Sequence, residues 1–133
     1  MLALETCPCT GGTLDKLIRP AILAVLAKGP LHGYKLAERI GRMPLFRGQN
    51  PDVSGVYRAL KAMESKDLVV SSWDLSENGP AKKSYRLTEA GGQCLFRWIE
   101  TLKQYRQGIT VLLKTARAAV AGRADVRSDQ SSK

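Results

Sequence analysis

Apolar residues recur at helical spacing early in the chain and predict a helix there. The set that follows the i, i+4, i+7, i+8 pattern of one helix face is Ile18, Ile22, Val25 and Leu26. Thr13 is the expected N-cap, and a carboxylate at Asp15 suits the helix dipole. Pro20 either kinks this helix or lies in its true first turn. Gly29 and Pro30 then end it.

Two more short helices are expected to follow. The first covers about Gly33 to Ile40, with Leu36, Ala37 and Ile40 on its apolar side. Residues 41–51, with their glycines, prolines and basic residues, should form a loop, and Asp52 should cap the third helix. Its residues expected to face the core are Val53, Val56, Tyr57, Leu60 and Met63. Small and basic residues are left for the opposite side: Ser54, Gly55, Arg58, Lys61, Ala62 and Ser65.

The periodicity then changes from helix to strand. Residues 69–75 are rich in β-branched and aromatic side chains and predict a strand. Asn78-Gly79 is a strong signal for a hairpin turn. Residues 83–87 should return as the second strand, so the middle of the chain is expected to fold as three helices and a hairpin.

A long last helix is expected over residues 89–121, capped by Thr88. Two sets of residues seven apart, three residues out of step, form an a/d seam of nearly four heptads. Its members are Leu95, Trp98, Leu102, Tyr105, Ile109, Leu112, Ala116 and Ala119. Because so small a domain has little surface left to cover this stripe, a second copy of the chain is expected to bury it, giving a homodimer.

These elements predict a mainly α fold with a small β-hairpin: a winged helix-turn-helix plus a long C-terminal dimerisation helix. The winged helix-turn-helix should occupy residues 13–88, after a flexible arm at 1–12. The polar residues 122–133 are expected to form a disordered tail.

The charge of the chain narrows the choice of partner. Its 133 residues carry a formal net charge of +9, which favours a polyanion, either nucleic acid or an anionic membrane surface. A merely solubilising surface is the alternative. The basic residues are spread through the fold instead of lining one amphipathic helix, which argues against a membrane surface. No signal peptide and no apolar run of about 20 residues is found, so a cytoplasmic location is expected.

The third helix offers the chemistry for double-stranded DNA. The major groove admits one α-helix, and an arginine such as Arg58 can bind guanine or a bridging phosphate. Basic residues at the base of the hairpin should lie on an adjacent phosphate or in the minor groove. The expected DNA-binding residues are Ser54, Gly55, Tyr57, Arg58, Lys61, Lys82 and Lys83.

Plainer interpretations stand beside this one. Arg58 and Lys61 could be solvated helix charges, and Lys82 and Lys83 ordinary solubilising residues of the hairpin. Tyr57 could be a core residue that makes no contact with DNA.

Two further residues have an expected structural role. Trp73 is expected to pack, and His32 to act as a cap or a packed polar group. No nucleophile–base pair, phosphate-binding glycine loop or paired metal ligand set is found, so we expect neither an enzyme nor a cofactor.

The three cysteines do not suggest a disulfide framework. Cys7 and Cys9 are too few for a zinc site within one chain, although two such pairs meeting across a dimer would supply four thiolates. A redox switch and a pair of free thiols are the other interpretations. Cys94 is expected to be a small core residue beside the seam.

Several segments together resemble the PadR-like transcriptional regulators. They are Ile22–Leu26, Gly29–Tyr34, Val56–Leu60, Met63-Glu64, Leu68-Val69, Gly79-Pro80, Lys83, Tyr85–Thr88 and Ala90-Gly91. The likeness spans roughly residues 17–100, and the single C-terminal helix resembles the smaller PadR-like subgroup. Residues 7–17 also resemble regulators that respond to polyhydroxybutyrate.

This resemblance implies a dimeric repressor that releases its operator when a small-molecule or polymer effector binds. It also implies that Tyr57 and Arg58 lie near DNA. Many family members carry Gly-Thr where this chain has Ser54-Gly55, so the hydroxyl contact would come from Ser54 or be absent. Some members bind flat aromatic drugs in the dimer pore, which makes Trp98 a candidate for an effector pocket as well as a packing residue.

The sequence thus predicts a regulator that binds specific double-stranded DNA. Half-sites about 10 bp apart, or a multiple of this, are expected. An effector would act by favouring one arrangement of the two protomers over another. The alternative function is a winged-helix adaptor that binds another protein without specific DNA binding.

Overall fold

The computed structural model describes residues 16–46, 53–75 and 79–131, with side chains as far as Ala124. It contains two compact units, one up to Phe96 and one from Arg97 onward. The expected caps Thr13 and Asp52, the arm at 1–12 with Cys7 and Cys9, and Asn78 all lie outside the described residues.

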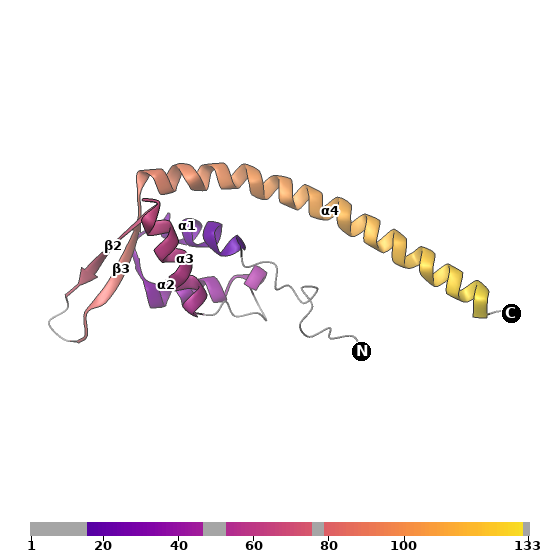
Figure 1. The fold of residues 1–133 in the computed structure, drawn as a ribbon, viewed down its shortest axis with the longest axis horizontal. Coiled ribbons are helices and arrows are strands. Elements are labelled where there is room, and N and C mark those ends of the chain that lie inside the picture. The colour runs from indigo at the N-terminus through magenta and orange to yellow at the C-terminus, as the bar shows by residue number, and fades with distance from the viewer. Residues whose placement is uncertain (1–15, 47–52, 76–78, 132–133) are drawn as a thin grey trace. The chain divides into compact units, whose positions relative to one another are not determined.

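The first unit is built on three helices that pack on one another: α1 (Ile18–Leu26), α2 (Gly33–Gly41) and α3 (Val53–Ser65). Figure 1 shows them side by side, with a hairpin extending from them. Pro20 lies in the first turn of α1, where a missing N–H costs no helical hydrogen bond. Gly29, at φ +148°, lets the chain leave α1.

The core forms where the apolar faces of the three helices meet. Its fully buried side chains are Ile22, Leu23, Leu36, Ile40, Val56, Leu60, Met63 and Val69. Full burial of each contributes roughly 1.5–3 kcal/mol. Val53, expected in this core, is 53% exposed because it stands in the first turn of α3, so that expectation is wrong.

The wing is a three-stranded antiparallel sheet in the order β1-β3-β2. Strands β2 (Val69–Asp74) and β3 (Lys82–Leu87) form the expected hairpin, in a register that runs from Val69 opposite Leu87 to Asp74 opposite Lys82. The two-residue strand β1 (Leu31–His32) pairs with the other edge of β3 and was not expected. A short 3₁₀ turn, η3 (Pro44–Phe46), lies within the expected loop and buries Phe46.

The last helix, α4, runs from Glu89 to Ser131 and so continues past the expected boundary at residue 121. Thr88 caps it as expected: the Gly91 N–H donates to Thr88 Oγ1 at 3.0 Å. The Thr88 hydroxyl in turn lies 2.6 Å from the Asp67 carbonyl oxygen and 3.0 Å from that of Leu68. Of the described helices, none is long and apolar enough to cross a membrane.

Candidate nucleic-acid interface

The outward face of α3 carries polar and basic side chains because its opposite face is committed to the core. Val56, Leu60 and Met63 are all fully buried. Ser54, Arg58 and Lys61 follow one another at i, i+4 and i+7 and are exposed. The helix therefore presents these three side chains outward, while Gly55 is half-buried.

Tyr57 lies where α3 meets the start of α2. Its side chain is 39% exposed, so it is neither wholly a core residue nor wholly a surface one. A Cβ built on Gly33 would lie 2.6 Å from Tyr57 Cε1 and 2.8 Å from the hydroxyl oxygen. A glycine at position 33 thus leaves room for the phenol ring against the α2 backbone.

The wing supplies Lys83 and Tyr85. Lys83 is half-buried, and its ammonium lies 5.6 Å from the centre of the Tyr85 ring, within the range of a cation–π contact. Tyr85 itself is only 4% exposed. Burial raises the pKa of the Tyr85 hydroxyl, with smaller contributions in the same direction from Glu64 and Tyr57.

A depression of about 570 Å³ lies between α3 and the wing. The residues that line it are Tyr57, Lys61, Glu64, Ser65, Lys83 and Tyr85. The Ser71 hydroxyl donates to Glu64 Oε1 at 2.8 Å and so ties the end of α3 to β2. Three of the predicted DNA-binding residues, Tyr57, Lys61 and Lys83, are therefore gathered around one surface feature. Ser54, Gly55 and Arg58 share the helix but do not line this depression.

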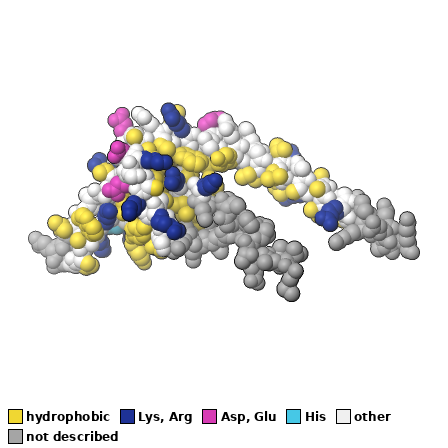
Figure 2. All heavy atoms as spheres, in the orientation of Figure 1, with side chains coloured by type: hydrophobic (Ala, Val, Ile, Leu, Met, Phe, Trp, Pro, Cys, Tyr) yellow, Lys and Arg dark blue, Asp and Glu magenta, His cyan; other side chains and the backbone are white. Residues whose placement is uncertain are grey.

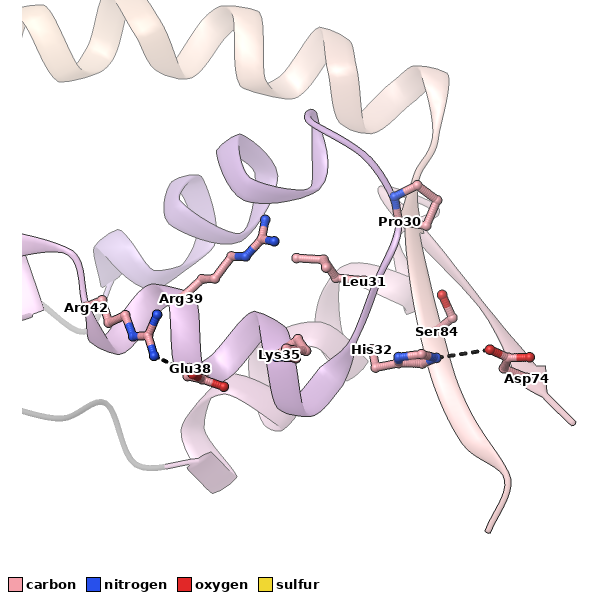
Figure 3. Close-up of a pocket in the computed structure, with 9 residues that line it drawn as sticks. All are labelled: Pro30, Leu31, His32, Lys35, Glu38, Arg39, Arg42, Asp74 and Ser84. Atoms are coloured by element: carbon pink, nitrogen blue, oxygen red, sulfur yellow. Dashed lines mark hydrogen bonds and ion pairs between the residues drawn. The ribbon is translucent and has the colours of Figure 1, made fainter. Parts of the chain in front are cut away.

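Helix α2 also has a basic face, whose residues were not among the predicted DNA-binding residues. Lys35, Arg39 and Arg42 recur at i, i+4 and i+7 and are exposed. They line a second pocket, of about 520 Å³, at the edge of the sheet (Figure 3). Since Leu36 and Ile40 fill the core side of α2, the spacing of these cations in the sequence was sufficient to find them.

One carboxylate offsets part of that basic face. Arg42 pairs with Glu38 at 2.6 Å, one turn away on the same helix. Figure 2 shows other Lys and Arg side chains gathered over the helical part of the first unit on the face in view.

His32 and Trp73 were both expected to have structural roles, and neither has the contacts that its expected role requires. His32 occupies the N-cap position of α2 but makes no capping hydrogen bond with its side chain. Its Nε2 lies instead 3.2 Å from Asp74 Oδ2, at the end of β2 (Figure 3). Trp73 is 63% exposed, so the expectation that it packs is wrong. It lies near the outer end of β2, beside the solvent-exposed Asp74 and Leu75.

In the second unit, the α4 side chains expected to form the seam are exposed. Exposure rises from 37% at Leu102 through 50% at Tyr105 to 65% at Leu112. Leu95 and Trp98 are half-buried, Ile109 is 60% exposed and Ala116 is exposed. Figure 2 shows hydrophobic side chains spaced along this helix. Cys94, expected in the core, is half-buried with a free thiol.

The described residues contain no group of three or more His, Cys, Asp or Glu side chains that could hold a metal ion. Cys7 and Cys9 lie outside this part of the chain, so the zinc and redox interpretations stay predictions.

Residues 22–97, more than half of the chain, match the transcriptional regulator PadR-like family. The chain belongs to this family. As a PadR-like regulator it is not an enzyme, as expected from the sequence. The matched span begins within α1 and includes α2, α3, the wing and the start of α4.

Solved structures agree with this assignment. The PadR-like chain is 31% identical to TA0346 of Thermoplasma acidophilum, a proposed transcriptional regulator, with a TM-score of 0.68 over 77% of this chain and 95% of that one. It is 28% identical to Bacillus subtilis PadR, solved in complex with operator DNA, with a TM-score of 0.55 over 62% of this chain and 46% of that one. A PadR family regulator from Clostridium difficile R20291 is 26% identical, with a TM-score of 0.59 over 72% and 97% of the two chains. No curated protein matches the PadR-like chain.

The winged helix-turn-helix with a long C-terminal helix is thereby confirmed. The finer resemblance of residues 7–17 to polyhydroxybutyrate-responsive regulators has no counterpart in these matches.

Proposed function

We propose that this PadR-like regulator binds a near-palindromic operator as a homodimer, with α3 in the major groove and the β2–β3 wing on the neighbouring backbone. The observation that carries the proposal is the gathering of Lys61 and Lys83, from two different elements, around one depression. The exposed Arg58 lies one turn before Lys61 on the same helix face.

Charge and similarity support the same partner. The chain carries a formal net charge of +9, and phosphate neutralisation by lysine and arginine dominates affinity for DNA. The Bacillus subtilis relative binds operator DNA. The basic face of α2, with Lys35 and Arg39, adds cations that suit the backbone beside the groove.

The exposed stripe of α4 supports a second copy of the chain as the dimer partner. Besides the a/d residues, three of the four e positions are apolar: Ile99, Leu113 and Val120 are 49%, 47% and 67% exposed, and the fourth is Arg106. A stripe this wide is broader than a two-stranded seam and suits a small helical bundle. Left in water it would be an aggregation hazard, so self-association explains it.

The proposed DNA binding is tested with fragments of genomic DNA that bind to the full chain and are retained by it. Arg58→Ala should weaken binding by about 1–3 kcal/mol if the guanidinium reads a base. Lys83→Ala should weaken all sequences alike and reduce the salt slope of log K by about 0.9. Fluorescence anisotropy across a salt series measures both effects.

Lys114→Ala is the matched control, because Lys114 is an exposed cation at the f position of the α4 heptads, away from the seam. Its affinity should equal that of the unaltered chain. Unchanged affinity in both Arg58→Ala and Lys83→Ala would remove the assigned interface. Failure to bind any duplex at low salt would favour the adaptor alternative.

The proposed homodimer is tested by analytical ultracentrifugation, which measures the sedimentation of the chain. Leu102→Glu and Ile109→Glu place charges in the stripe and should shift the protein to monomers and reduce operator affinity together. Lys114→Glu, the same new side chain at the f position, should leave the dimer intact. An unaltered chain that sediments as a monomer at micromolar concentration would contradict the proposal.

Repression, release by an effector and a cytoplasmic location complete the proposed role. The likeness of residues 7–17 supports a polymer effector such as polyhydroxybutyrate. Co-sedimentation with polymer granules, compared between the full chain and its Cys7→Ser/Cys9→Ser variant, tests this. A reporter gene behind the retained operator distinguishes repression from activation.

A further inference from the structure

Strand β2 has one open edge. The sheet order β1-β3-β2 leaves one side of β2 without a neighbouring strand in the described part of the chain. The outer end of the hairpin extends beyond the helices (Figure 1). Natural proteins usually protect such an edge with lysine, proline, a bulge or a very short strand. Strand β2 has six residues without lysine or proline, and its register with β3 is continuous.

The hydrogen bonds to β3 show which backbone groups of β2 face the open edge. The Thr88 N–H donates to the Leu68 carbonyl oxygen at 3.2 Å, so the position just before β2 is a hydrogen-bonded one. Hydrogen-bonded and non-hydrogen-bonded positions alternate along an antiparallel pair. Every second residue of β2 therefore directs its N–H and C=O groups outward, where another strand can bind them. These residues are Val69, Ser71 and Trp73.

The side chains along this edge are suited to contact with another protein surface. Trp73 and Leu75, at the outer end of the strand, are 63% and 79% exposed. Asp74 is the one charged residue of β2, although the whole chain has a formal net charge of +9. Two copies of this cationic chain can therefore meet at β2 without placing cations of that strand opposite each other.

We propose that β2 pairs with β2 of a second copy of the chain, in antiparallel orientation about a two-fold axis at Ser72. The sheet then continues from one wing into the other. Such an axis, perpendicular to the sheet, keeps each face on its own side and makes every contact occur twice. Ser71 of one copy lies opposite Trp73 of the other, and the outward N–H and C=O groups of these two residues bond to each other.

This register covers both exposed apolar side chains. Trp73 lies beside the small side chain of Ser71 of the other copy, and Tyr85 is the next residue in that row because it is opposite Ser71 within its own wing. Leu75 comes opposite Val69 of the other copy. An axis at Ser71 would instead place Leu75 beyond the end of the other strand and leave it exposed, so the axis at Ser72 is preferred.

The other face of the joined sheet is complementary in charge. Within one wing Arg86 is opposite Val70, and Asp74 is opposite Lys82. The pairing places Asp74 of the second copy on the open side of Val70, with its Cα about 10 Å from that of Arg86, or two strand spacings. An extended arginine side chain can span this distance across a valine. Asp74 also keeps its contact with His32 of its own wing, at 3.2 Å.

Wing pairing gives the chain a self-association surface that is separate from the apolar stripe of α4. If α4 joins two copies, each dimer still has two open β2 edges, so pairing between wings links dimers into tetramers or longer assemblies. The larger assemblies rest on the proposed function, because they need the α4 dimer. The pairing of two wings does not.

The test uses the full chain with Leu102→Glu and Ile109→Glu, in which the α4 stripe is disrupted. Sedimentation velocity from micromolar to millimolar concentration should show association of this chain into dimers. Ser72 is exposed and lies on the proposed axis, at a non-hydrogen-bonded position where opposing side chains come closest. Adding Ser72→Lys or Ser72→Glu should therefore weaken association severalfold, because each puts like charges directly opposite.

An equimolar mixture of the Ser72→Lys and Ser72→Glu chains provides the decisive comparison, because it puts opposite charges on the axis. The mixture should associate severalfold more tightly than either chain alone. Ala81→Lys, which adds the same charge at an exposed position outside β2, is the matched control and should associate as its parent does. A mixture no tighter than its components, or a parent that stays monomeric up to about 1 mM, would overturn the proposal.

Fluorescence tests the register. The chain has two tryptophans, so Trp98→Phe in the same background leaves Trp73 as the one emitter. Its emission should shift to the blue over the concentration range in which the chains associate, since pairing removes Trp73 from water. Association without any shift would overturn the axis at Ser72.

The unaltered α4 separates this inference from the proposed function. In that chain Ser72→Lys should abolish species larger than a dimer and leave the α4 dimer intact. If Ser72→Lys abolishes all association while Leu102→Glu and Ile109→Glu have no effect, the α4 dimer of the proposed function is removed and the wing pairing is kept. An α4 dimer whose association does not respond to Ser72→Lys at any concentration keeps the proposed function and overturns the wing pairing.

Discussion

The phenol ring of Tyr57 in α3 lies against the backbone of Gly33 at the start of α2, where a Cβ would stand 2.6 Å from Tyr57 Cε1. Gly91, in the first turn of α4, meets its neighbour even more closely, because a Cβ there would stand 2.1 Å from the Leu68 carbonyl oxygen. The two glycines differ in what would have to move. Tyr57 can swing its ring toward solvent, whereas the Leu68 carbonyl is fixed in the backbone.

Gly33→Ala should therefore cost little stability and yet disturb the binding face. The helix propensity gained, up to about 1 kcal/mol, offsets the displacement of the Tyr57 ring. We expect a net change within about 1 kcal/mol in urea unfolding, with a severalfold loss of operator affinity. In a Tyr57→Ala background the same substitution should be stabilising. An equal effect in both backgrounds would show that the ring is not the obstacle.

Gly91→Ala should destabilise the fold by about 1–3 kcal/mol, because relief of the clash shifts the Leu68 backbone. That shift would disturb the hydrogen bond from the Thr88 N–H to the Leu68 carbonyl, 3.2 Å long. Gly92→Ala, the next residue, is the matched control: a Cβ there meets nothing within 4 Å. It should be neutral or stabilising by up to about 1 kcal/mol in the same unfolding experiment. Equal midpoints for the two variants would contradict this account.

Thr88→Ala should cost about 1 kcal/mol because the Gly91 N–H loses its acceptor at the start of α4. Thr88→Ser keeps the hydroxyl and should retain most of the stability. Thr110 is a suitable control, since its hydroxyl only donates to the Arg106 carbonyl within the helix, at 2.9 Å. Thr110→Ala should change the unfolding free energy by less than about 0.5 kcal/mol.

The Tyr85 hydroxyl should ionise late, because burial, assisted by Glu64, raises its pKa above the ordinary value. The folded state therefore holds this proton more tightly than the unfolded chain does. Its contribution to stability is complete below about pH 10 and is lost as pH rises through the higher pKa of the folded state. The component of tyrosinate absorbance that titrates above the ordinary tyrosine pKa should disappear in Tyr85→Phe and remain in Tyr34→Phe. An unchanged titration curve in Tyr85→Phe would refute the assignment.

The elements that could be predicted are those whose signal is local. The apolar spacing of Leu36, Ala37 and Ile40 defines α2, which extends only one residue beyond the expected helix. Strand β1 could not be found this way, because Leu31 and His32 have no period of their own and become a strand only through pairing with β3. Val53 fits the helical pattern of the core face and yet is 53% exposed, because periodicity does not register that a residue lies in the first turn of its helix.

The residues of the candidate site likewise differ in whether a local sequence signal predicts them. The exposure of Arg58 and Lys61 follows from helix geometry, and the same geometry accounts for the exposure of Lys35 and Arg39 on α2. A pocket between the wing and the start of α2, lined by Tyr34, Tyr57, Trp73 and Tyr85, depends on the tertiary packing of these two elements. For that reason Trp73, which suggests packing in a strand, lies instead at the rim of a cavity.

His32 is both the last residue of β1 and the N-cap of α2. The middle strand of the wing, β3, pairs with β1. One peptide bond then joins the last residue of β1 to Gly33, the first residue of α2. Strand β3 is thus coupled to α2 through β1, and α2 packs in turn on α1 and α3. A displacement of β3 is therefore expected to move the start of α2 with it, so that the wing and the helices respond to a load as one body.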